Sequence, residues 1–306
     1  MEIYLPIAQM SVNPLIVLAM GGGVGLLSGM LGIGGGFLMT PLLMFIGIPP
    51  AVAVATQSNQ LVAASVSGVI AHWRRGNVDF KLGLVMLLGG GLGSLIGVAI
   101  FAKLKALGQV DLVISLTYVL FLGSISSLMM VDNFRVLVLR RNAPAKRRKL
   151  HEHTALDRLP LRMRFPRSRL YISALGPLLI GFVGGMMVAI MGTGGGFLLV
   201  PAMIYILGMP AGLVAGTSLF QIVFTTGVTT FLQSITTHAV DIVLAVILII
   251  GGVIGAPIGT RLGNLMRPEY ARLTLALIVL SVALKLAFDL FVTPENLFSV
   301  STPGGL

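Results

Sequence analysis

Gly-Gly-Gly-Phe-Leu-Met-Thr-Pro at residues 34–41 returns as Gly-Gly-Gly-Phe-Leu-Leu-Val-Pro at residues 194–201, 160 positions later. Further along each copy, Val78-Asp79 returns as Val240-Asp241. An ordered string of this length recurring with its flanking motifs indicates an internal duplication, in which each copy folds into the same unit.

The composition identifies the kind of protein that carries this duplication. Hydrophobic residues make up 56% of the chain, charged residues only 10%, and the mean hydropathy is +0.99. Soluble proteins have about 25% charged residues. The sequence therefore predicts an all-α integral membrane protein. We interpret the apolar stretch over residues 12–31 as a retained span, because it is too long for a signal peptide and lacks a preceding basic flank.

Each half of the chain divides into five apolar segments. They cover residues 12–31, 37–48, 51–73, 82–102 and 110–130, then 172–191, 197–209, 211–235, 242–260 and 272–291. The segments at 37–48 and 197–209 are shorter than the roughly 20 residues that a spanning helix needs, so we expect half-helices after the glycine breaks. Glycine-broken helices at matching places are typical of transporters built from two repeats.

Charge predicts how these segments are oriented. Of the 21 Lys and Arg residues, 18 fall in the stretches 72–81, 131–170 and 261–272. An odd number of crossings per half places these stretches on one side, which the positive-inside rule makes cytoplasmic. We therefore expect two inverted repeats, at residues 1–130 and 171–306, joined by a basic cytoplasmic loop at 131–170, in a bacterial inner membrane.

Several functions are disfavoured by what the sequence lacks. The chain has no Cys, which excludes disulfides and thiolate chemistry. Its net charge of +11 is concentrated in the 131–170 stretch, next to membrane spans, where it suits anionic lipid. We therefore expect no nucleic-acid partner. The few His and acidic residues are scattered, so the sequence predicts no metal site, no cofactor and no enzyme activity.

Glycines spaced four apart are expected to pack helices together. They occur as Gly21-Gly25-Gly29, Gly89-Gly93-Gly97 and Gly251-Gly255-Gly259. Small residues on one helix face allow close approach between helices in lipid. Asp79 and Asp241, which each precede a long apolar segment, are expected to cap it, although a gating or proton-transfer role is the second interpretation.

The two glycine breaks are the strongest candidates for a binding site. A half-helix that starts after such a break presents unpaired backbone N–H groups and the positive end of its dipole, which bind anions. The candidate residues are Gly34, Gly35, Gly36, Thr193, Gly194, Gly195 and Gly196. The other interpretation is that these glycines only permit a tight turn and close helix contact.

Polar residues at the start of the next segment form a second group of candidates. They are Thr56, Gln57 and Ser58 in the first half, and Thr217 and Ser218 in the second. Their hydroxyl and amide groups suit the oxygens of a small oxyanion. Hydrogen bonding between helices, or capping, is the equally weighted alternative.

The glycine strings, the Val-Asp pairs and the glycine ladders together resemble the TauE/SafE sulfite-exporter family. The resemblance covers nearly the whole chain except the 131–170 stretch, which is unusually long and basic. It implies a permease that exports sulfite, an organosulfonate or a related sulfur anion. We therefore predict a secondary transporter that binds a small anion between two half-helix N-termini. The competing hypotheses are a channel-like anion pore and a membrane scaffold acting through the basic loop.

Overall fold

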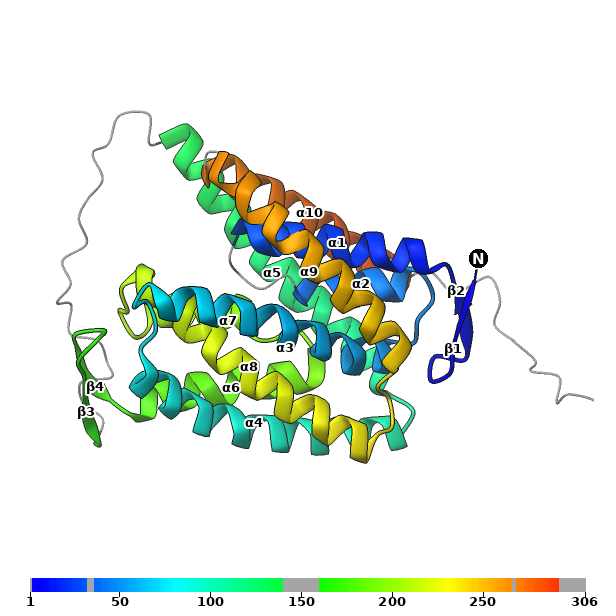
Figure 1. The fold of residues 1–306 in the computed structure, drawn as a ribbon, viewed down its shortest axis with the longest axis horizontal. Coiled ribbons are helices and arrows are strands. Elements are labelled where there is room, and N and C mark those ends of the chain that lie inside the picture. Colours follow the sequence, from blue (N-terminus) through cyan, green and yellow to red (C-terminus); the bar gives the residue numbers. More distant parts are fainter. Residues whose placement is uncertain (1, 32–35, 140–159, 266–267, 292–306) are drawn as a thin grey trace, which may run out of the picture.

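The computed structural model describes residues 2–31, 36–139, 160–265 and 268–291, which form helices and two short antiparallel hairpins (Figure 1). The elements are β1 (Ile3–Leu5), β2 (Met10–Val12), α1 (Pro14–Leu31), α2 (Gly36–Phe45), α3 (Pro50–Arg74), α4 (Phe80–Ala106), α5 (Val110–Leu139), β3 (Arg162–Phe165), β4 (Leu170–Ser173), α6 (Leu175–Met191), α7 (Gly196–Tyr205), α8 (Ala211–Thr236), α9 (Ile242–Leu265) and α10 (Pro268–Phe291).

Each predicted apolar segment corresponds to one helix, and the two half-helices α2 and α7 start at the last glycine of each glycine run. The stretch 131–170, predicted to be a loop, has regular secondary structure at both of its ends. The helix α5 continues to Leu139, and β3 pairs with β4, with Phe165 opposite Leu170. β1 pairs with β2 in the same antiparallel way, with Leu5 opposite Met10.

The distribution of side chains on the long helices is that of a membrane protein. Within the described residues, three helices are long and apolar enough to cross a bilayer, namely Phe80–Ala106, Gly212–Thr236 and Ile242–Gly259. The first of these, α4, exposes Leu84, Leu88 and Leu92 while the ladder glycines at 89, 93 and 97 are buried. A soluble protein would bury those leucines, whereas in a bilayer they face lipid.

The predicted packing role of the glycine ladders is confirmed. α4 lies against α6, and α1 lies against α9. A Cβ built on Gly93 would lie 2.0 Å from the Phe182 carbonyl oxygen of α6, and one on Gly259 would lie 2.0 Å from the Leu26 carbonyl oxygen of α1. Only glycine allows the backbones to approach this closely. Because α4 and α1 belong to the first half and α6 and α9 to the second, each close contact joins the two halves.

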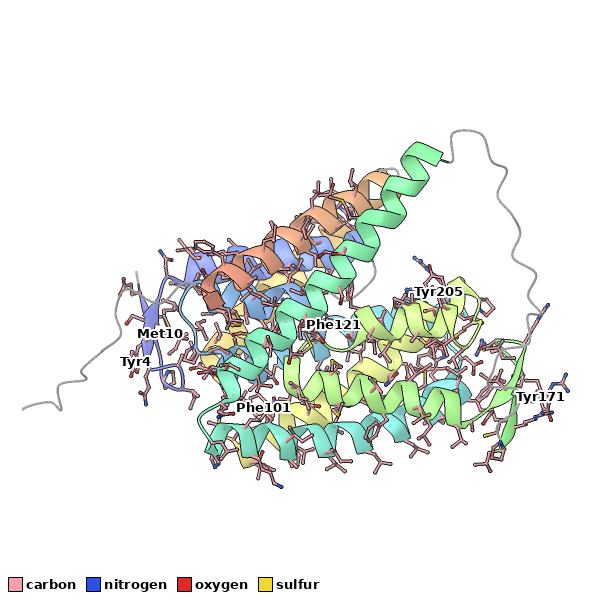
Figure 2. The ribbon with its side chains drawn as sticks, turned by 180° about the vertical axis from the view of Figure 1, so that it is seen from behind. Tyr4, Met10, Phe101, Phe121, Tyr171 and Tyr205 are labelled. Atoms are coloured by element: carbon pink, nitrogen blue, oxygen red, sulfur yellow. The ribbon has the colours of Figure 1, made fainter. Side chains whose placement is uncertain are left out.

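The two hairpins lie at opposite ends of the helix bundle (Figure 1). α2 returns to the end where the chain begins, since a Cβ on Gly47 would contact Met10 of β2. α7 returns to the other end, where Met203 and Leu207 share a core cluster with Phe165 of β3. Figure 2 shows Tyr205 of α7 at the same end as Tyr171 of β4. The α1–α2 and α6–α7 units therefore fold back from opposite ends.

Asp79 and Asp241 cap helices, as predicted. Asp79 Oδ1 accepts from the backbone N–H of Leu82 at 3.1 Å, and Asp241 Oδ1 accepts from Leu244 at the same distance. Both carboxylates are buried. The second oxygen of each carboxylate accepts a hydrogen bond from a hairpin. Asp79 Oδ2 accepts from the N–H of Ser168 in the β3–β4 hairpin, and Asp241 Oδ2 accepts from the N–H of Ile7 in the β1–β2 hairpin, both at 3.0 Å. Each cap thus also ties the two halves together.

Candidate functional site

The N-terminal ends of the two half-helices meet in the middle of the molecule. Phe37 follows the first glycine run and Phe197 follows the second, and their rings stack with centroids 4.5 Å apart and planes at 28°. Phe121 of α5, seen near the middle of the molecule in Figure 2, lies edge-on to Phe197 at 6.2 Å. The two segments singled out by their sequence are therefore in direct contact.

The start of α7 has the backbone conformation that its glycines permit. Gly194 and Gly195 have φ of +71° and +68°, in the left-handed region that other residues rarely adopt. No side chain caps this helix at Gly195. The Thr193 hydroxyl, 2% exposed, accepts a long hydrogen bond of 3.4 Å from the N–H of Gly195. Among the described residues, no side chain therefore accepts from the first N–H groups inside α7, which lie at the positive end of the helix dipole.

The start of α2 is held by the buried amide of Gln57 on α3. Its Nε2 donates to the Gly36 carbonyl oxygen, and its Oε1 accepts from the Thr40 hydroxyl one turn further along α2. The sequence predicted Gly36 and Gln57 as site residues, and the structure brings these two into direct contact. Gly34 and Gly35 lie outside the described residues.

Leu61 of α3 lies between the two glycine runs. A Cβ built on Gly36 would lie 2.6 Å from its Cδ1, and one on Gly194 would lie 3.0 Å from the same atom. Close by, the hydroxyl of Tyr118 donates to the carbonyl oxygen of Met191 at the end of α6, and Thr40 Oγ1 lies 3.4 Å from the same oxygen. Glycine at these positions therefore keeps α2, α3, α6 and α7 close together.

The other predicted polar residues do not converge on this place. The Thr56 hydroxyl accepts from the backbone N–H of Asp241 at 2.9 Å, and the Thr217 hydroxyl accepts from that of Asp79 at 3.0 Å. The hydroxyls of Ser58 and Ser218 donate to carbonyl groups of their own helices, at Val54 and Ala215. The threonine contacts support the interhelical role that the sequence left open for this group, whereas the two serine hydroxyls bond within their own helices.

Sequence reasoning did not single out Thr40 or Tyr118. Thr40 precedes Pro41 in the first repeated string, where the second string has Val200 before Pro201. That difference between two otherwise similar strings was the available signal. Tyr118 lies inside an apolar segment and carried no comparable signal.

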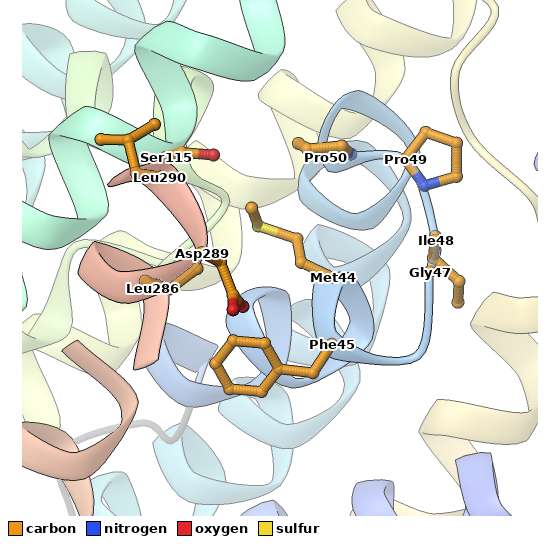
Figure 3. Close-up of a pocket in the computed structure, with 10 residues that line it drawn as sticks. All are labelled: Met44, Phe45, Gly47, Ile48, Pro49, Pro50, Ser115, Leu286, Asp289 and Leu290. Atoms are coloured by element: carbon orange, nitrogen blue, oxygen red, sulfur yellow. The ribbon is translucent and has the colours of Figure 1, made fainter. Parts of the chain in front are cut away.

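A separate pocket of about 260 Å³ opens beside the end of α2 (Figure 3). Phe45, Pro49, Ser115 and Asp289 are among the residues that line it, and none of the predicted site residues does. The ammonium group of Lys285 lies 3.9 Å from the centroid of the Phe45 ring. The pocket is thus distinct from the meeting point of the half-helices.

Comparison with known proteins identifies what kind of membrane protein has this architecture. The family model described as "Sulfite exporter TauE/SafE" matches residues 17–286, which include most of α1, most of α10 and every helix between them. The chain belongs to this family. It is therefore an integral membrane transporter.

Its relatives carry matching descriptions. The "Probable membrane transporter protein YjnA" of Bacillus subtilis is 30% identical over 88% of this chain and 98% of its own length. A "Probable membrane transporter protein" of Xylella fastidiosa is 32% identical over 83% of this chain and 87% of its own. The Arabidopsis thaliana "Sulfite exporter TauE/SafE family protein 3" matches a third of this chain at 32% identity. No solved structure matches the chain.

Proposed function

We propose that this transporter exports a small sulfur-containing oxyanion, such as sulfite or an organosulfonate, and binds it between the N-termini of α2 and α7. The observation that carries the proposal is the contact between Phe37 and Phe197, which brings two half-helix N-termini together. The family's description and the name of the Arabidopsis relative supply the substrate class.

The chemistry of the meeting point suits an oxyanion. Backbone N–H groups at a helix N-terminus donate hydrogen bonds to anions, and the helix dipole adds favourable electrostatic energy. Glycine at 194 and 195 permits the left-handed backbone that leads the chain into the N-terminus of α7. The proposed site comprises the following residues: Gly34, Gly35, Gly36, Gln57, Thr193, Gly194, Gly195 and Gly196. Thr56, Ser58, Thr217 and Ser218 are left out because of the contacts they make.

The proposal includes an inverted arrangement of the two halves. The α1–α2 and α6–α7 units fold back from opposite ends of the bundle, and the contacts of α1 with α9 correspond to those of α6 with α4. Inversion would place residues 1–130 and 171–306 in opposite orientations. The basic stretch at 131–170 would then lie on the cytoplasmic side of a bacterial inner membrane.

Flux measurements test the transport proposal. We expect purified protein in proteoliposomes to move sulfite or a short sulfonate at a rate that saturates with concentration. Flux that stays linear in concentration would instead indicate the channel-like pore. No flux of any sulfur oxyanion, in protein that remains monodisperse, would refute the proposal.

A charge placed at Thr193 tests the site itself. Thr193→Asp would put a carboxylate beside the open N-terminus of α7, where it would occupy the place of the substrate anion. We expect this variant to fold and lose transport. Thr193→Asn, of similar size and neutral, is the matched control and should keep most of the flux. Equal flux in the two variants would place the anion elsewhere.

A further inference from the structure

One face of α8 carries a buried stripe of uncharged polar side chains. Gln221, Thr225, Thr229 and Gln233 follow one another at four-residue spacing, and each is at most 1% exposed. Residues four apart lie on the same helix face. The stripe begins near the middle of α8 at Gln221 and ends in its last turns at Gln233. The helix rises about 18 Å over these twelve positions.

Three oxygen atoms of this stripe have no hydrogen-bond partner among the described residues: Gln221 Oε1, Thr229 Oγ1 and Gln233 Oε1. By contrast, the Thr225 hydroxyl donates to the Gln221 carbonyl oxygen of its own helix at 2.8 Å. A buried polar atom without a partner costs about 1–3 kcal/mol. Among the described residues, α8 has one further buried oxygen without a partner, Thr230 Oγ1, which lies outside the stripe. Three of the four thus share one helix face, which points to a ligand there.

The orientation of the amides determines which ligand these oxygens can accept. Gln233 Nε2 donates to the Ala189 carbonyl oxygen of α6 at 2.9 Å. Turning the amide over would bring its Oε1 against that carbonyl oxygen, so the free atom of Gln233 is the acceptor. An amide oxygen accepts hydrogen bonds or coordinates a cation, and it repels an anion. The stripe therefore does not extend the anion site.

The matching helix of the first half shows that packing does not require this stripe. Thr56 of α3 and Thr217 of α8 make the same bond to an Asp N–H, so positions 161 apart correspond. Gln60 then matches Gln221. The positions matching Thr225, Thr229 and Gln233 hold Ala64, Gly68 and His72. The same scaffold is therefore built in one half without the side-chain oxygens of Thr229 and Gln233.

Next to the stripe, α6 ends at the second glycine break. Gln233 reaches its last turn at Ala189, and the helix ends at Gly192 in the left-handed conformation. The last carbonyl groups of a helix carry partial negative charge, and helix ends of this kind coordinate sodium in transporters with broken helices. The described residues contain no cluster of three or more His, Asp or Glu. Neutral oxygens at a negative helix end suit a singly charged cation.

We propose that Thr229 and Gln233, together with carbonyl groups of the last turn of α6, bind a sodium ion. Only the chain from Gly192 to Gly195 separates this place from the start of α7. Opposite charges bound so close together attract, so each ligand raises the affinity for the other. This coupling rests on the proposed anion site, whereas the cation site itself does not.

Thermal unfolding of the purified protein tests the cation site, with NaCl compared against choline chloride at equal ionic strength. We expect a saturable rise in Tm with Na⁺ alone. Thr229→Val keeps the shape of the side chain and removes the oxygen, so the Na⁺ concentration for half the effect should rise by about tenfold or more. Without Na⁺ this variant should be at least as stable as the parent, because an unpartnered hydroxyl is gone.

Thr226→Val is the matched control, since its hydroxyl is equally buried on α8 and donates to the helix carbonyls of Ile222 and Val223. It should keep the Na⁺ response. A Tm rise that choline reproduces, or that survives Thr229→Val, overturns the cation site. Na⁺ binding that leaves sulfite binding unchanged would keep the cation site and count against the anion site beside it.

Discussion

The glycine at 93 illustrates what single residues contribute here. Its missing Cβ leaves room for the Phe182 carbonyl oxygen of α6, which would otherwise lie 2.0 Å away. Because the obstacle is backbone, it cannot move aside like a flexible side chain. Gly93→Ala should therefore destabilise the protein by about 1–3 kcal/mol or more. The measurement is thermal unfolding in detergent.

Gly91, two residues away on the same helix, provides the control. A Cβ there would meet nothing within 4 Å, so Gly91→Ala should be neutral or stabilising by about 0.5–1 kcal/mol. If both variants unfold at the same temperature, the close approach of α4 and α6 is wrong. The added apolar surface alone would not give Gly91→Ala and Gly93→Ala different stabilities, since each substitution adds one methyl group.

Glycine spacing was sufficient to predict this packing, whereas the polar candidates needed the structure. The glycine runs are 160 positions apart, and the same offset would pair Ser58 with Ser218. The connection from α7 to α8 is one residue longer than that from α2 to α3. Gln57 therefore corresponds to Ser218, and Thr56 to Thr217. A shift of one residue rotates a helical position by about 100°, enough to exchange a site-facing residue for a packing one.

At the scale of elements, each hairpin is linked to a helix cap in the other half. Substitution of Asp79 tests this link. Asp79→Ala removes the acceptor of the Leu82 N–H and leaves the Ser168 N–H unpartnered. Loss of a cap costs about 0.5–2 kcal/mol, and a buried unpaired donor adds about 1–3 kcal/mol. We expect Asp79→Ala to lower Tm clearly, and Asp79→Asn, which keeps one side-chain oxygen, to lower it less.

Neither variant should change the concentration of anion that gives half-maximal flux, because Asp79 lies at a helix end and contacts only structural groups. A well-folded Asp79→Asn protein without transport would support the other interpretation of this residue, as a gate or a proton carrier. The same comparison at Asp241, with Leu244 and Ile7 as donors, provides an independent repeat.

The hairpins themselves were not predicted, although the sequence repeats a short motif within them. Leu5-Pro6 and Phe165-Pro166 lie 160 positions apart, like the glycine runs. Strands of three and four residues are too short to show an alternation of apolar and polar side chains. Helices of ten residues or more, bounded by glycine and proline, gave a stronger signal. Their predicted bounds lie within five residues of the observed ones, except that α5 ends at Leu139 and not at 130.

At the scale of the whole molecule, the inverted arrangement makes a prediction about sidedness. The α3–α4 and α8–α9 connections occupy corresponding places in the two halves, and inversion would put them on opposite sides of the membrane. Arg75 and His238 are exposed in these connections. The chain has no Cys, so Arg75→Cys and His238→Cys each introduce one thiol.

In intact cells, a membrane-impermeant maleimide should label His238→Cys and leave Arg75→Cys unlabelled until the membrane is opened. The positive-inside rule gives the direction, because Arg74, Arg75 and Lys81 surround the first connection. Gln109→Cys, in the exposed connection between α4 and α5, is the control and should label like His238→Cys. Labelling of Arg75→Cys and His238→Cys from the same side would mean that the two halves run parallel. The N-termini of α2 and α7 would then approach from one side of the membrane, and a single anion could not be held between them.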